Sequence, residues 1–197
     1  MEFKIICEDG ATDLDPDELS GLLPTHLIVQ AQLNEWEQVN ILNAEKWLGS
    51  RKPKNVLSED FCRSLHKKMF DQTWSWAGTF RRSDKNIGVD WTQISVCLKN
   101  LLEDTKYWFK HEVFTLNEIG ARFHHRLVLI HCFPNGNGRH ARLMTDALMI
   151  EKSYPRFSWG SLMKDSVLAR SKYLEALRQA DAGDVEPLKN FSVANIH

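Results

Sequence analysis

The sequence lacks any long apolar run. Its longest apolar stretches, such as Leu127 to Ile130, are far too short to cross a bilayer. The N-terminus, MEFKIICEDG, has no basic stretch followed by an apolar core, so it does not have the pattern of a secretion signal. We therefore expect neither a membrane segment nor a membrane partner.

The sequence also lacks an excess of charge and any clustering of cysteine. Lysine and arginine number 25 against 26 acidic residues, so no bulk positive field favours binding to duplex nucleic acid. The four cysteines, at positions 7, 62, 97 and 132, contain no pair spaced like a zinc or redox motif. Scattered thiols are typical of a reducing compartment, which predicts a cytoplasmic location.

Glycine and proline are few, 10 and 6, and they leave long segments in which apolar residues recur at helical intervals. These stripes are Phe61, Leu65 and Met69; Leu116, Ile119, Phe123 and Leu127; Met144, Ala147 and Leu148; and Leu174 and Leu177. Ser58 and a Thr115–Glu118 capping box precede the first two stripes. We also expect helices over 26–48 and 93–110. Polar residues and a glycine interrupt 81–91, which favours a short β-hairpin or an extended loop there. The predicted class is all-α.

The first 20 residues contain seven acids and one lysine. Such a segment is either a solvated arm or a docking segment for a partner. We expect residues 1–50 to form this acidic arm and a helix packed on the core, and residues 51–197 to form the core domain.

The segment that indicates chemistry is 130–142, IHCFPNGNGRHAR. A strongly apolar helix is expected to end near His131, and residues 134–137 then predict a tight turn, because Gly and Asn adopt left-handed backbone angles most easily. A new helix is expected to start near Gly138. Its first turn offers unpaired backbone N–H groups and the positive end of the helix dipole, which together predict an anion site.

The side chains around this turn fit a reaction at a phosphate. Arg139 and Arg142 lie three apart, so both guanidinium groups can reach one polyphosphate. His131 lies across the turn, where a neutral imidazole could take a proton from an incoming hydroxyl. Phe133 is expected to be buried under the turn and to fix its shape.

The segment resembles the signature of Fic-domain proteins, His-x-Phe-x-(Asp/Glu)-Gly-Asn-Gly-Arg-x-x-Arg, at every fixed position but one. The resemblance covers about residues 55–191. Outside the signature it rests on three segments: Leu65-His66 through Trp76-Ala77-Gly78 and Phe80-Arg81; Arg170, Tyr173, Ala176 and Leu177; and Gly183-Asp184 with Pro187-Leu188. The acidic start and Leu33 to Gln38 are similar to the mobile mystery protein B subgroup. The resemblance implies a helical bundle with a short β-hairpin flap.

The resemblance also implies an activity, the transfer of AMP from ATP to a Ser, Thr or Tyr hydroxyl of another protein, with His131 as general base. It implies that the nucleotide is bound by Asn135, Gly136, Asn137, Gly138, Arg139, Arg142 and Tyr173. Among these, Arg142 would hold the distal phosphates and Tyr173 would line the adenine side. The target would pair in a strand-like manner with a flap, roughly 82–89, that includes Arg82, Ser83, Asp84, Lys85, Asn86, Ile87 and Gly88.

The departure from the signature is Asn135, where AMP-transferring members have an acidic ligand for Mg²⁺. An amide oxygen is a weaker ligand for this cation than a carboxylate, so the resemblance implies a weakened Mg²⁺ site. A related branch with Asn at this position transfers phosphate instead of AMP, but it departs at the later glycines, and this chain keeps Gly138. A second, lesser departure is Cys132, where Pro is common.

Three alternatives remain open. The first is the phosphate transfer just described. The second is a non-catalytic module that binds a nucleotide or a protein. The third is a metal hydrolase that uses His124, His125, His131 and His140, although no HExxH motif or paired carboxylate accompanies them. Many family members carry an inhibitory (Ser/Thr)-x-x-x-Glu-(Gly/Asn) helix. Here Ser171 to Ala176 matches it only in part, so a separate inhibitory protein, or none, is expected.

Overall fold

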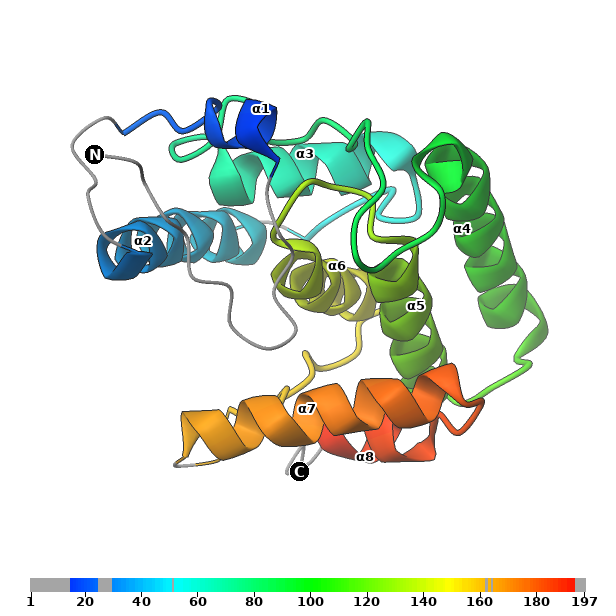
Figure 1. The fold of residues 1–197 in the computed structure, drawn as a ribbon. Helices are drawn as coiled ribbons and strands as arrows, with labels where there is room; N and C mark the ends of the chain where they lie inside the picture. Colours follow the sequence, from blue (N-terminus) through cyan, green and yellow to red (C-terminus); the bar gives the residue numbers. More distant parts are fainter. Residues whose placement is uncertain (1–14, 25–29, 51, 162, 164, 194–197) are drawn as a thin grey trace.

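The computed structural model describes residues 15–24, 30–50, 52–161, 163 and 165–193, which form a helical bundle (Figure 1). Within these ranges the helices are α1 (Pro16–Leu19), α2 (Gln30–Gly49), α3 (Glu59–Phe70), α4 (Ile94–His111), α5 (Leu116–Ile130), α6 (Asn137–Glu151), α7 (Ser166–Asp181) and α8 (Glu186–Val193), with a turn of 3-10 helix, η1 (Trp91–Gln93), before α4. The all-α class predicted from the sequence is confirmed.

The helices begin where the sequence supplies caps. The Ser58 hydroxyl accepts a hydrogen bond from the Phe61 N–H at the start of α3, and the Thr115 hydroxyl accepts one from the Glu118 N–H at the start of α5. The helix expected over 93–110 is α4. The helix expected over 26–48 is α2 from residue 30 onward, and residues 26–29 lie outside the described part of the chain.

The pair α5 and α6 lies at the centre of the bundle. Helix α5 packs against α4, α6 and α8, while α3 packs against α2 and α6 (Figure 1). The predicted apolar stripes supply the core between them, including Leu65, Met69, Phe123, Leu127, Met144 and Leu148, each at most 2% exposed. A second, smaller cluster joins Tyr173, Ala176 and Ala180 of α7 to Ala121 of α5. The order of the bundle therefore places both ends of the 131–136 connection against the core.

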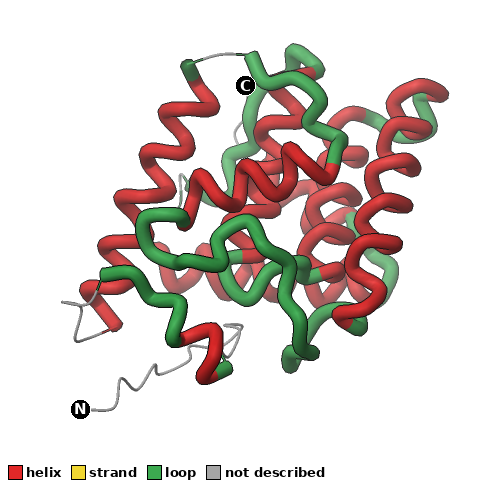
Figure 2. Tube along the Cα trace, turned by 90° about the horizontal axis from the view of Figure 1, so that it is seen from above, coloured by secondary structure: helices red, strands yellow, loops and turns green. Residues whose placement is uncertain are grey.

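The β-hairpin expected within 81–91 is not formed. Over the described residues there is no strand (Figure 2), and the sole β-bridge among them pairs Leu22 with Trp74. Residues 82–89, which we call the flap, form an irregular loop instead. Side-chain contacts hold this loop in place of a strand ladder: its main-chain carbonyl groups at Ser83 and Val89 accept hydrogen bonds from the Arg81 guanidinium.

Residues 15–24 lie on the segment that follows α3. The Leu23 N–H donates to the Thr73 carbonyl (2.9 Å), the Ser75 N–H donates to Gly21 (2.8 Å), and the Trp76 indole N–H donates to Glu18 (2.9 Å). The described end of the acidic segment thus docks on the chain's own core, and the acids before residue 15 lie outside the described residues. No helix in the described ranges has the length and apolar character needed to span a membrane.

Candidate functional site

The site begins where α5 ends, at His131. This residue caps the helix with left-handed backbone angles, φ 56° and ψ 60°, and its N–H still donates to the Leu127 carbonyl at 3.3 Å. A residue other than glycine is uncommon in this region, and such strain is concentrated at functional sites. The His131 side chain is buried, 3% exposed, at the start of the connection to α6.

The connection from α5 to α6 is a tight turn that Asn137 closes. The Asn137 side-chain oxygen accepts the Phe133 N–H (2.9 Å), and its amide nitrogen donates to the Phe133 carbonyl (2.7 Å). Both polar atoms of this side chain are therefore used inside the turn, and Asn137 can offer a ligand its backbone N–H and the second N–H of its amide. Gly136 has φ 78°, and a Cβ added there would lie 2.5 Å from a ring carbon of Phe70, so the turn requires glycine.

A buried histidine, His66, packs against the core side of the turn. The His66 ring stacks on Phe133 with 3.7 Å between ring centroids. Its Nδ1 accepts the Gly78 N–H (3.0 Å), so the proton is on Nε2, which donates to the Asn135 carbonyl (3.1 Å). Burial holds the pKa of His66 well below its usual range, which keeps this neutral tautomer. Phe133 is buried, as its expected anchoring role requires.

The N-terminus of α6 has the open backbone that an anion site needs. The first intrahelical bond there runs from the His140 N–H to the Gly136 carbonyl, so the N–H groups of residues 137–139 have no carbonyl partner within the helix. A Cβ added at Gly138 would meet only the Tyr173 hydroxyl oxygen, at an ordinary 3.6 Å. The fold itself would thus accept alanine at Gly138, and a glycine there matters for whatever approaches the helix from outside.

The first signature arginine, Arg139, is already paired. Its Nη1 lies 2.6 Å from a carboxylate oxygen of Glu37 in α2, and its Nη2 donates to the Asn135 side-chain oxygen at 3.3 Å. Glu37 is only 5% exposed, and its other carboxylate oxygen accepts the Trp74 indole N–H at 2.7 Å. An anion at this point would therefore share Arg139 with a buried carboxylate.

The second signature arginine, Arg142, lies on the side of α7. Its guanidinium carbon is 5.2 Å from the centre of the Tyr173 ring, and the Tyr173 hydroxyl is 3.0 Å from His124 Nε2. Arg142 makes no ion pair within the described part of the chain. Its positive charge is thus more available to an anion than that of Arg139.

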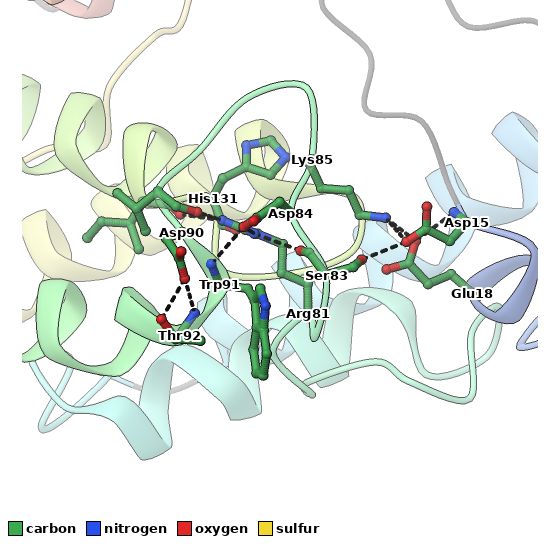
Figure 3. Close-up of polar contacts among 12 residues, drawn as sticks. Asp15, Glu18, Arg81, Ser83, Asp84, Lys85, Asp90, Trp91, Thr92 and His131 are labelled. Atoms are coloured by element: carbon green, nitrogen blue, oxygen red, sulfur yellow. Dashed lines mark hydrogen bonds and ion pairs between the residues drawn. The ribbon is translucent and has the colours of Figure 1, made fainter.

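The flap lies directly over His131 (Figure 3). A Cβ added at Gly88, whose φ is 107°, would be 2.7 Å from the His131 Cβ. Further along the flap, Lys85 Nζ pairs with carboxylate oxygens of Asp15 (2.8 Å) and Glu18 (2.5 Å) at the start of α1 (Figure 3). The Lys85 side chain is only 2% exposed, so the N-terminal segment holds the flap at this point.

The electrostatic surroundings of His131 keep its ring neutral. Burial, first, and the positive charges of Arg81 and Lys85 together lower the pKa of His131 to about 4. At pH 7 the imidazole can therefore accept a proton but carries no charge. The Val128 carbonyl opposes these effects by accepting a hydrogen bond from the ring.

The other histidines do not gather into a metal site. His124 bonds to Tyr173, His125 lies 2.7 Å from Asp181, and His140 bonds to the Cys62 carbonyl. Among the residues that the structure describes, no three His, Cys, Asp or Glu side chains are arranged to hold a metal ion. The geometry gives the metal-hydrolase alternative no support.

Comparison with known proteins agrees with the signature. Residues 56–149 match the model of the Fic/DOC family. This segment is a Fic/DOC family domain. The protein adenylyltransferase Fic of Drosophila erecta is 32% identical over 117 residues, 58% of this chain, and that of Nematostella vectensis is 37% identical over 78 residues, 38% of this chain. The chain spans only 22% and 16% of the length of these two relatives.

Solved Fic structures share the fold. The N-terminal Fic domain of a Bartonella effector protein from Bartonella sp. AR 15-3 superposes with a TM-score of 0.71 at 15% identity, over 90% of this chain and 92% of its own. The N-terminal Fic domain of a Bartonella quintana effector with bound ADP gives a TM-score of 0.68 at 17% identity, over 89% and 93% of the two chains. The helical bundle of this Fic/DOC domain is therefore that of the family.

Three residues at the site were not predicted as part of it: Glu37, His66 and Arg81. Each is a polar residue buried in the fold and bonded to the signature segment. His66 and Arg81 belong to the segments that resemble the family, so the resemblance marked their positions without giving their contacts. Glu37 lies in Leu33 to Gln38, the segment similar to the subgroup, and its only other signal was an acid within the apolar pattern of α2.

Proposed function

We propose that this chain transfers AMP from ATP to a hydroxyl side chain of another protein. The observation that carries the proposal is one short turn with two functional sides. A buried neutral histidine lies at its beginning, and a helix N-terminus with open N–H groups and two arginines lies at its end. The names of the relatives at 32% identity and the ADP bound to a Fic structure of the same fold support the same activity.

His131 is the proposed general base. Its ring accepts the proton of a Ser, Thr or Tyr hydroxyl while the oxygen attacks the α-phosphorus of ATP. The bond from that phosphorus to the bridging oxygen breaks, and pyrophosphate leaves with the bond electrons. The proton on the imidazole then passes to solvent or to the leaving pyrophosphate. The pKa of about 4 ensures that the base is unprotonated before the reaction at neutral pH.

The start of α6 is the proposed phosphate site. Preorganised donors aimed at the phosphoryl oxygens stabilise the charge that develops during transfer. The N–H groups of residues 137–139 point out of the first turn of α6, and Gly138 leaves the backbone open to close approach. Arg139 would add a charged donor, and Arg142, supported by Tyr173, would hold the distal phosphates. Asn135 and Gly136, which lie in the turn just before α6, would also contact the nucleotide.

The flap is the proposed docking site for the target. Arg82, Asp84, Asn86, Ile87 and Gly88 are exposed at the surface of this loop, next to the base. Main-chain pairing along such a loop tolerates varied target sequences, because it uses few side chains. Ser83 and Lys85, by contrast, are bonded to Asp15 and contribute by shaping the flap.

The residues present fit a resident Mg²⁺ poorly. The Asn135 side-chain oxygen accepts the Gly136 N–H (2.5 Å) and an Arg139 N–H (3.3 Å), so positive hydrogen-bond donors occupy the direction in which a cation would bind. The steps above are therefore derived from the chain's own residues, without a metal ion. A nucleotide that arrives with its own Mg²⁺ is compatible with this arrangement.

We further propose that residues 51–197 act as the Fic core, that residues 1–50 pack on it, and that the protein works in the cytoplasm on a protein substrate. A separate inhibitory protein is compatible with the described helices. Glu175, the acid in the partial inhibitory match, pairs with Arg178 and Gln179 on the exposed face of α7.

The test uses labelled ATP, a cell lysate and intact-mass measurement of the modified proteins. AMP transfer adds an adenosine-containing mass, phosphate transfer adds phosphate alone, and a binding module adds nothing. Removal of the base in His131→Ala should lower transfer by about 10²–10⁴-fold with nucleotide binding nearly unchanged. His131→Asn is the matched variant, because asparagine accepts the left-handed backbone of residue 131. Near-wild-type labelling by both variants would remove His131 from the role of base.

A further inference from the structure

One buried arginine connects the flap to the end of α5. Arg81 is 2% exposed, and its guanidinium donates to four main-chain carbonyl groups. These belong to Ser83 (2.8 Å), Val89, Ile130 (3.4 Å) and His131 (2.6 Å) (Figure 3). The backbone N–H of Arg81 also donates to the Cys132 carbonyl at 3.0 Å. A single residue thus bonds both ends of the flap and three consecutive residues around the base.

The chemistry of this position requires arginine. A guanidinium has five N–H donors in a fixed planar arrangement, whereas a lysine ammonium has three on one atom and cannot reach carbonyls on opposite sides. The last carbonyl groups of α5 lack partners within the helix and carry the negative end of its dipole, which favours a cation there. Asp84, which is mostly exposed, adds an ion pair at 3.6 Å.

The contacts of Arg81 fix the distance between the flap and His131. The flap passes over His131 so closely that a Cβ at Gly88 would lie 2.7 Å from the His131 Cβ and 2.9 Å from Arg81 Nη2. The gap between flap and base is therefore set by the same guanidinium that bonds the His131 carbonyl. A target segment that lies along the flap would have its hydroxyl placed relative to the base by this contact.

We propose that Arg81 is a positioning residue that holds the flap and His131 as one unit, so that the docked hydroxyl meets the base at a fixed distance. The inference rests on the proposed function for its effect on transfer. The structural part of the inference, that Arg81 fixes the flap, is independent of the proposed function. Arg81 touches neither the nucleotide site at α6 nor the arginines there, so its loss acts on the target side of the reaction.

The first measurement is the release of the flap, which needs no activity. A lysine-specific endoproteinase cleaves after lysine and leaves the exposed Arg82 of the same flap intact, and the Lys85 side chain is 2% exposed in the intact flap. Arg81→Lys and Arg81→Gln should each raise the rate of cleavage after Lys85 by about tenfold or more, because local opening governs the access of a protease. Arg178→Gln, at a mostly exposed arginine of α7, is the control and should leave the rate unchanged.

The second measurement separates the charge of Arg81 from its geometry. The charged side chains that act on the His131 ring are Arg81 and Lys85; Asp84 pairs with Arg81, and Asp15 and Glu18 pair with Lys85. Histidine NMR titration, with the His131 signal assigned by its loss in His131→Asn, should give a higher pKa of His131 in Arg81→Gln. In Arg81→Lys, which keeps the positive charge, this pKa should stay closer to the wild-type value.

The third measurement is transfer of label from ATP to lysate proteins. Arg81→Lys should lower transfer by about 10²-fold, as a misplacement near 1 Å does, while the Kd for ATP changes less than about threefold. Unchanged cleavage after Lys85 in both folded variants would overturn the inference, as would transfer equal to that of Arg178→Gln. If Arg81→Gln does not fold, the cleavage and transfer rates of Arg81→Lys alone test the inference. A wild-type protein that transfers nothing contradicts the proposed function, while the cleavage and NMR results still test Arg81.

Discussion

The ion pair between Glu37 and Arg139 predicts that a carboxylate of α2 weakens nucleotide binding. The two side chains are 2.6 Å apart, and Glu37 is 5% exposed, so little water screens its charge. A phosphate bound at the other edge of the Arg139 guanidinium would meet this negative charge across the same group. Replacement of Glu37 by glutamine removes the charge and keeps the size of the side chain.

The size of the effect follows from Coulomb's law. A carboxylate and a phosphate on opposite edges of one guanidinium are about 6 Å apart, and at an effective dielectric constant near 20 their repulsion is about 3 kcal/mol. The Arg139 side chain is 34% exposed, so solvent and salt screen the bound phosphate. We therefore expect about half of this repulsion to be realised in Glu37→Gln, a gain near 1.4 kcal/mol or about tenfold in Kd.

Calorimetry with ATP on the wild type and Glu37→Gln measures this gain directly. Glutamine keeps a side-chain oxygen for the Trp74 indole N–H, now bonded at 2.7 Å, so the fold should be preserved. Glu35→Gln is the matched control, because it removes the same charge from an exposed position two residues earlier on α2. Equal affinity in wild type and Glu37→Gln would mean that Arg139 does not contact a phosphate. Weaker binding in Glu37→Gln would mean that Glu37 orients Arg139 for the nucleotide, and would refute the competition argument.

The remaining predictions concern the second arginine, the turn, the helix start and the buried histidines. Arg142→Ala should weaken ATP binding more than AMP binding in calorimetry, by about 1.5–3 kcal/mol, because only ATP has distal phosphates. Asn135→Asp should weaken binding of metal-free ATP by charge repulsion, and added Mg²⁺ should restore more affinity in this variant than in the wild type. Gly138→Ala should raise the thermal midpoint, since alanine favours a helix by about 1 kcal/mol, and should lower ATP affinity. The pKa values of about 3 for His124 and about 4 for His140 lie below the unfolded value, so the unfolded chain binds more protons below pH 6.5. Denaturant unfolding should therefore show stability falling as pH decreases from about 6.5 toward 4, by about 1–2 kcal/mol per histidine at pH 5.

The helices could be predicted from the sequence because their signals are local. Ser58 and Thr115 cap helices at the residues where the pattern placed them, and α5 ends one residue before His131, as the apolar run and the glycines indicated. A capping side chain and an apolar stripe act within one or two turns of the chain. They can therefore be recognised without knowing what lies opposite.

The partners of the site residues could not be predicted, because they come from distant parts of the chain. Glu37 meets Arg139 across 102 positions, and Lys85 meets Asp15 across 70. The prediction of a β-hairpin at the flap was wrong because its bonding partners were not recognised from the local pattern. Its polar groups bond to the neighbouring Arg81 and, across 68 positions, to Asp15, and these side-chain contacts replaced the strand pairing that the local pattern favoured.

The two sides of the turn depend on each other through charge. Without a ligand, burial and the cations Arg81 and Lys85 hold the pKa of His131 at about 4, which makes the ring a weak base at neutral pH. A polyphosphate at the start of α6 brings several negative charges near the same ring, and negative charge favours the protonated imidazole and so raises its pKa. In the proposed reaction His131 would therefore become a stronger base when a nucleotide is bound, which is when a hydroxyl docked on the flap has a phosphorus to attack. The strained backbone of His131 and the internal bonds of Asn137 keep the two sides at a fixed separation, so this coupling requires no movement of the turn.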